Sequence, residues 1–151
     1  MREIEFRGKA GKWVYGSLIN APDYCCILQD VENLQSIDYP YLNGDSGTFD
    51  GYATPIDKNT IGQYTGLKDK NGTKIFEGDI LKLKQPKDER EFIAKVEFGN
   101  PNGNYDWGWQ LVFVKPYSIN NDILCWVGME CIGIESEVVG NIYDNPELIG
   151  E

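Results

Sequence analysis

The side chains best placed for acid–base chemistry are two carboxylates, Glu77 and Asp79, which flank Gly78. Carboxylates two residues apart in a turn can converge on one substrate and exchange a proton with it. The commoner role of such an aspartate is to accept hydrogen bonds from the backbone N–H groups of its own turn, and we expect that role here. The chain contains no histidine, which excludes every catalytic triad that uses imidazole. We therefore expect no catalytic residue and no enzyme, and a carboxylate-based enzyme is the least favoured alternative.

Metal sites are also poorly supported by the residue types and their spacing. Residues 69–72 (Asp-Lys-Asn-Gly) superficially resemble a calcium loop, but such a loop carries glycine at its sixth position and supplies several carboxylates. Here glycine is fourth, and Thr73 stands where a ligand is needed, so we expect a hairpin turn. Zinc sites use closely spaced pairs of cysteine or histidine. The four cysteines are Cys25, Cys26, Cys125 and Cys131. Their spacing predicts thiols without metal or disulfide, and we expect no cofactor.

Charge is distributed unevenly along the chain. The net charge of -10 divides into -5 for residues 1–57 (four basic, nine acidic), +3 for residues 58–95 (nine basic, six acidic) and -8 for residues 96–151 (one basic, nine acidic). An acidic surface repels phosphate backbones, so the overall balance disfavours non-specific nucleic-acid binding. A local basic face on the central segment remains as the alternative.

The alternation of residue types predicts short strands. Residues 61–65 and 73–76 flank the turn at 69–72, and a strand at 80–84 places Leu81 and Leu83 on one face with Lys82 and Lys84 on the other. The first 20 residues predict a hairpin. Further strands are expected at residues 24–28, 52–54, 92–98, 107–113, 123–127, 129–134 and 138–143, and a short helix or turn at 145–148.

These elements predict a mainly β protein with an N-terminal β-hairpin and little helix. From about residue 60 onward, the order of strands and turns suggests a small, strongly bent barrel of the SH3-like kind. A chain of 151 residues suits one compact unit. Within it we expect an N-terminal hairpin and irregular segment at 1–57 and a barrel-like domain at 58–151.

Two long segments carry a resemblance to a known family. The run TIGQYTGLKDKNGTKIFEGDILKLK (residues 60–84) and the run EVVGNIYDNPEL (residues 137–148) resemble the YopX protein family of bacteriophages and prophages. The opening MREIEFRGKAGKWVYG is similar to the start of that family, and the resemblance extends to residue 98 in the central segment. It implies a phage or prophage origin. Because the family has no established biochemical function, the resemblance assigns no catalytic residue.

The same two segments supply the candidate binding residues. Gly62 and Gly66 let another backbone or a ligand approach the strand between them, and Gly140 has a similar place near the end of the last strand. If the segments meet in space, their polar side chains form a cleft. The favoured alternative is structural, with asparagine and threonine satisfying buried backbone groups and glycine forming a bulge. The candidate binding residues are Gln63, Tyr64, Thr65, Asn141 and Tyr143.

The sequence therefore favours a non-enzymatic interaction module that binds another protein, of host or phage, or a second copy of itself. The alternative is a nucleic-acid-binding β-barrel that uses the basic segment 58–95 and aromatic residues such as Tyr64 and Phe76. No apolar run reaches the ~20 residues that a membrane-spanning helix needs, and we expect no membrane partner. The first residues have the pattern of a strand and not that of a signal peptide. We therefore expect the protein to be located in the cytoplasm of a bacterial host.

Overall fold

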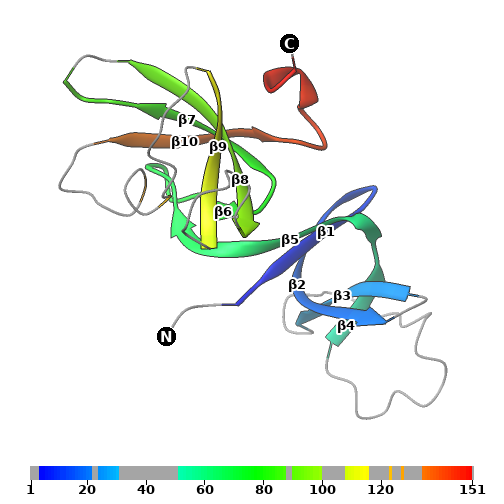
Figure 1. Ribbon diagram of the computed structural model, residues 1–151. Coiled ribbons are helices and arrows are strands. Elements are labelled where there is room, and N and C mark those ends of the chain that lie inside the picture. The colour runs from blue at the N-terminus through cyan, green and yellow to red at the C-terminus, as the bar shows by residue number, and fades with distance from the viewer. Residues whose placement is uncertain are drawn as a thin grey trace, which may run out of the picture. The chain divides into compact units, whose positions relative to one another are not determined.

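The computed structural model describes residues 4–21, 24–30, 51–87, 90–99, 108–115, 123, 127 and 134–150, and these residues are mainly β-strand (Figure 1). The chain closes with a single 3-10 turn, η4 (Pro146–Leu148). The prediction of a mainly β fold with little helix is confirmed. The strands are β1 (Phe6–Ala10), β2 (Lys12–Ala21), β3 (Tyr24–Asp30), β4 (Gly51–Pro55), β5 (Asp57–Lys68), β6 (Lys74–Phe76), β7 (Asp79–Lys84), β8 (Glu91–Gly99), β9 (Gly108–Lys115) and β10 (Glu135–Asn141).

The chain divides into two compact units, Met1–Gln63 and Tyr64–Glu151. The division falls inside β5, whose first part pairs with β1 and whose second part pairs with β6. The boundary predicted from the sequence, after residue 57, lies a few residues earlier.

The first unit is built on the predicted N-terminal hairpin. β1 and β2 pair antiparallel around Gly11, whose φ of 82° lies in the left-handed region that glycine adopts at little cost. β3 pairs with the far end of β2, and β4 pairs with β3. Val14, Cys26 and Ile27 are buried in this unit.

The second unit contains an antiparallel sheet in the order β10-β7-β8-β9. Alternation along β7 and β8 sends one set of side chains into the core and the other to the surface, as strand geometry requires. The buried cluster comprises Ile75, Leu81, Leu83, Phe92, Ala94, Val96, Leu111 and Ile123. Among the described strands the sheets stay open and no barrel closes, so the mainly β class holds without the SH3-like barrel.

Several finer expectations fall on particular residues. The strand expected at residues 123–127 is wrong at the two described positions, because Ile123 and Val127 have helical backbone. Both are apolar and pack on the core cluster, which explains why composition alone suggested a strand. Cys25 and Cys26 are buried thiols, whereas Cys125, Cys131 and Trp107 lie outside the described residues.

No helix in the described part of the chain is long and apolar enough to cross a membrane. No cluster of three or more cysteine, aspartate or glutamate side chains there could hold a metal ion.

Candidate interaction surface

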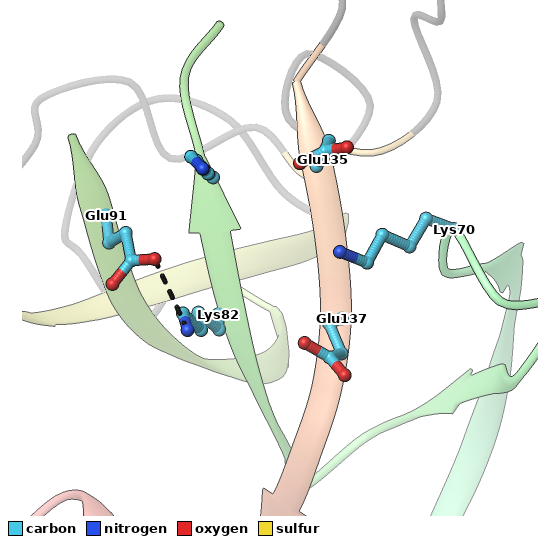
Figure 2. A pocket seen from close by; sticks show the side chains of 6 residues that line it. Lys70, Lys82, Glu91, Glu135 and Glu137 are labelled. Atoms are coloured by element: carbon cyan, nitrogen blue, oxygen red, sulfur yellow. Dashed lines mark ion pairs between the residues drawn. The ribbon is translucent and has the colours of Figure 1, made fainter. Parts of the chain in front are cut away.

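One face of the second sheet is lined by charged side chains of both signs. β7 sends Leu81 and Leu83 into the core, so Lys82 and Lys84 point together to the opposite face, as the sequence predicts. The neighbouring strands then decide what surrounds these lysines. We call the six residues that line the resulting recess the charged face: Lys70, Lys82, Lys84, Glu91, Glu135 and Glu137 (Figure 2).

Strand register interleaves the two signs of charge. Across β7 and β10, Lys84 is paired with Glu135 and Lys82 with Glu137. Across β7 and β8, Lys84 is also paired with Glu91. Opposite charges directly across neighbouring strands stabilise a sheet modestly. Each lysine of β7 therefore has a carboxylate on an adjacent strand.

A resolved ion pair joins two of these side chains. Lys82 Nζ lies 3.3 Å from Glu91 Oε2, and the two side chains are 41% and 49% exposed. Ion pairs this exposed contribute between about 0 and 1 kcal/mol, because water screens the attraction and ordering two long side chains costs entropy. This pair fixes the side chains only weakly.

Lys70, the remaining residue of the charged face, lies in the turn after β5. The backbone N–H of Lys70 donates to the carbonyl oxygen of Ser136 over 3.0 Å, which holds the turn beside β10. Figure 2 shows the Lys70 side chain lying beside β10, with its ammonium between Glu135 and Glu137. Within the described part of the chain, these two glutamates and Lys70 have no ion-pair partner within 4 Å. Their charges are therefore available to an outside group.

The shape of the recess limits what it can hold. Its cavity volume is about 160 Å³, whereas pockets for cofactors and drug-sized molecules are usually about 300–1,000 Å³. Its walls are long, half-exposed side chains rather than a buried apolar lining. These properties are typical of a surface that meets another surface and do not favour a small-molecule pocket.

Asp69 holds the turn that carries Lys70. One oxygen of its carboxylate, Oδ1, accepts hydrogen bonds from the N–H groups of Asn71 and Thr73, each over 2.9 Å. The other oxygen, Oδ2, accepts from the N–H of Val138 on β10, also over 2.9 Å. Asp69 is 7% exposed, and its carboxylate faces N–H donors. Asp69 therefore caps the hairpin turn that the sequence predicts.

The first group of predicted binding residues lies on β5. Gln63 is paired with Phe6 in the first unit and is half-buried. Tyr64 is buried, and its ring lies 5.5 Å from the ring of Phe76. The Thr65 hydroxyl donates to the carbonyl oxygen of Ile75 over 2.8 Å and accepts from the Leu67 N–H over 3.1 Å. Tyr64 and Thr65 are thus engaged in packing and backbone bonding.

The second group lies at the end of β10. Asn141 is 9% exposed, and its Oδ1 accepts from the N–H groups of Tyr143 and Asp144 over 3.0 and 2.9 Å. Its Nδ2 donates to Asp144 Oδ2 over 3.2 Å, and its backbone N–H donates to Asn145 Oδ1 over the same distance. Asn141 therefore builds the turn after β10. Tyr143 is half-buried within that turn.

Within the second unit, Tyr64 of the first group and Asn141 of the second border the turn between β6 and β7. Tyr64 is paired with Phe76 at one end of this turn, and Asn141 is paired with Asp79 at the other. Asp79 is buried, and its Oδ2 accepts from the Phe76 N–H over 2.8 Å. The capping role expected for this aspartate is confirmed. This turn therefore connects the two groups. The described hydrogen bonds of Thr65 and Asn141 stabilise the backbone on either side of it.

The charged face itself was not predicted from the sequence as a site. Alternation places Lys82 and Lys84 on one face, but Glu135 and Glu137 come from a segment far along the chain, whereas Glu91 comes from the next strand, β8. A signal exists in retrospect: Glu135 and Glu137 have the same two-residue spacing as the lysines they oppose. The two lysines and the two glutamates form one surface because β10 pairs with β7 in a register that sets Glu135 opposite Lys84 and Glu137 opposite Lys82.

Comparison with known proteins agrees with the β architecture. A crystal structure titled protein EF1440 from Enterococcus faecalis aligns with a TM-score of 0.52 and 22% sequence identity, covering 99% of this chain and 100% of that one. At this identity the likeness shows the fold alone. No curated protein sequence matches the chain. The family model described as YopX protein matches residues 6–150, nearly the whole chain. The chain therefore belongs to the YopX protein family.

Proposed function

We propose that this chain is a non-enzymatic module that binds another protein, and that its partner docks on the charged face. The observation that carries the proposal is the arrangement of Glu135, Glu137 and Lys70, whose charges lack an ion-pair partner among the described residues. The resemblance to phage proteins sets the expected context, which is the cytoplasm of a bacterial host. The partner is then a host or phage protein.

Charge complementarity defines the kind of partner surface. The face offers two carboxylates on β10 with a lysine between them, so it complements a surface that presents basic side chains around an acidic one. Such complementarity governs specificity and the rate of encounter more than the final affinity. We therefore expect association to slow as salt is added.

The alternation of charge is also what disfavours nucleic acid. Lysines that bind a phosphate backbone work by forming a continuous positive track. Here Lys82 and Lys84 lie between glutamates of β8 and β10, and the six residues of the charged face sum to zero. The basic segment 58–95 therefore supports nucleic-acid binding less than its composition suggests.

A charge-reversal experiment tests the proposed surface. The intact chain serves as bait in lysate of the bacterial host, with and without nuclease, and a captured protein is then purified for a direct affinity measurement. We expect Glu135→Lys with Glu137→Lys to weaken binding at least about tenfold, because like charges across an interface repel. The control is Glu147→Lys, an exposed residue of η4 outside the charged face. Equal affinity of both variants and the native chain would place the partner elsewhere.

Fluorescence anisotropy with random-sequence DNA and RNA tests the alternative. At ~150 mM salt, even frankly basic proteins bind non-specifically with dissociation constants of only ~10⁻⁴ to 10⁻⁶ M. We expect no measurable binding at that salt concentration. Micromolar binding that weakens steeply from low to physiological salt would replace the protein-binding proposal with the nucleic-acid one.

A further inference from the structure

The turn between β5 and β6 contains a chemically reactive pair, Asn71 followed by Gly72. Both residues are exposed. A side chain built at Gly72 would meet nothing within 4 Å, so the surroundings leave room for chemistry there. Asparagine is among the thermolabile residues of proteins, and a following glycine offers the least steric hindrance to attack on its side chain.

We propose that Asn71 is a site of spontaneous deamidation, and that Asp69 suppresses this reaction while the turn is folded. In the reaction the Gly72 nitrogen loses its proton and attacks Cγ of Asn71. The new C–N bond closes a five-membered succinimide, and the side-chain nitrogen leaves as ammonia. Water then opens the ring at either carbonyl and yields aspartate or isoaspartate. Water is the only co-reactant, and no redox change occurs.

The folded turn restrains the nucleophile. The Gly72 N–H donates to the carbonyl oxygen of Asp69 over 3.0 Å, so the nitrogen is committed to a hydrogen bond with its proton in place. The residues around it are fixed as well, because Asn71 N–H and Thr73 N–H both donate to Asp69 Oδ1. Attack on Cγ requires these bonds to open, so the reaction rate follows the local opening of the turn.

The same geometry predicts the consequence of the reaction. Asp69 N–H donates to the Thr73 carbonyl oxygen over 2.9 Å and closes a three-residue loop with Gly72 at φ 84°. Isoaspartate routes the backbone through the side-chain carbon and adds one atom to this loop. The loop then no longer brings the Thr73 N–H to the Asp69 carboxylate. Isoaspartate formation is therefore expected to disrupt this turn, whereas the aspartate product keeps the normal backbone.

The first test compares the same residue in two states of the full chain. Native and urea-unfolded samples are incubated in mildly alkaline buffer, and conversion of Asn71 is followed by peptide mass spectrometry. We expect conversion to be at least about tenfold slower in the native sample, since it must await opening. Equal rates in the two samples would overturn the proposal.

Two variants test the role of Asp69 in the native state. Asp69→Ala removes the carboxylate and is expected to accelerate conversion several-fold, whereas Lys70→Ala keeps both backbone hydrogen bonds of the turn and is expected to react as slowly as the native chain. A folded Asp69→Ala that reacts no faster than Lys70→Ala would contradict the role of Asp69. If Asp69→Ala does not fold, the native-to-unfolded ratio still decides whether the turn protects Asn71.

The refolding consequence has its own control. Chains carrying isoaspartate at position 71 are separated after reaction in urea and refolded beside Asn71→Asp, which gains the same charge without the extra backbone atom. We expect a lower melting temperature for the isoaspartate chain than for Asn71→Asp. Identical melting temperatures would show that the turn tolerates the inserted atom.

Discussion

The carboxylate of Asp69 accepts a hydrogen bond from the backbone N–H of Val138, a residue 69 positions later in the chain, over 2.9 Å. The same carboxylate caps its own turn through the N–H groups of Asn71 and Thr73. One side chain therefore fixes a local hairpin and anchors it to a distant strand. This connection also positions Lys70 on the charged face.

Removing this carboxylate is expected to be costly. Asp69→Ala leaves three part-buried backbone N–H groups without their acceptor, and each lost hydrogen bond contributes about 0.5–1.5 kcal/mol to stability. We expect the melting temperature of Asp69→Ala to fall by at least several degrees in thermal unfolding. Asp57→Ala is the matched control, because Asp57 accepts from Asn59 N–H in the same manner but is exposed. A similar loss in both variants would show that the contact with Val138 adds nothing.

Gly72 is predicted to matter for its backbone conformation alone. Its φ is 84°, and an added Cβ would meet no atom within 4 Å, so any cost of a side chain is backbone strain. We expect Gly72→Val to destabilise by about 1 kcal/mol or somewhat more and to lower the melting temperature by several degrees. Gly72→Asn should lose less, because asparagine tolerates the left-handed region. An unaltered midpoint for Gly72→Val would contradict the observed turn.

Gly140 is predicted to matter for space. A Cβ at this position would lie 2.5 Å from Asn145 Oδ1, which accepts from the N–H of Asn141. We expect Gly140→Ala to destabilise the chain by displacing Asn145, as measured by urea unfolding. The added cost should shrink when Asn145 is also changed to glycine, because glycine lacks all three Asn145 side-chain atoms that would lie within 3.0 Å of the added Cβ. A double-mutant cycle with no coupling between the two sites would refute this explanation.

The ion pair between Lys82 and Glu91 is predicted to contribute little to folding. Both side chains are close to half exposed, and such pairs contribute about 0.2–1 kcal/mol. A double-mutant cycle with Lys82→Gln and Glu91→Gln should give a coupling energy within that range and weaken further in high salt. A coupling of several kcal/mol would mean that the pair is far better ordered than its exposure indicates.

The local features of the second unit could be predicted from sequence because short-range chemistry determines them. The Asn71–Gly72 pair predicts a turn with positive φ at Gly72, and alternation predicts the common orientation of Lys82 and Lys84. Both predictions are confirmed. The capping role of Asp79 also follows from its place in a tight turn.

The features that depend on distant segments could not be predicted in the same way. The turn sequence indicates that Asp69 caps local N–H groups but contains no signal for Val138. Two of the acidic neighbours of Lys82 and Lys84, Glu135 and Glu137, are placed by the register of β10 against β7, which no local pattern specifies. Composition therefore indicates a basic segment at residues 58–95, whereas the folded chain surrounds Lys82 and Lys84 with glutamates and forms a surface of mixed charge. Thr65 and Asn141, by contrast, make the hydrogen bonds to nearby backbone groups that the favoured structural interpretation of these residues expects.

The contacts of the Asp69 turn with β10 also cover part of an edge strand of the sheet. β10 is the terminal strand in the order β10-β7-β8-β9, and terminal strands attract the strands of other molecules into aggregates. Here the Ser136 carbonyl oxygen and the Val138 N–H, two groups that an incoming strand would seek, are already bonded to Lys70 and Asp69. The turn thus occupies two hydrogen-bonding groups of this edge strand, as a further strand would. Another molecule cannot add a strand through these two groups while the turn is in place.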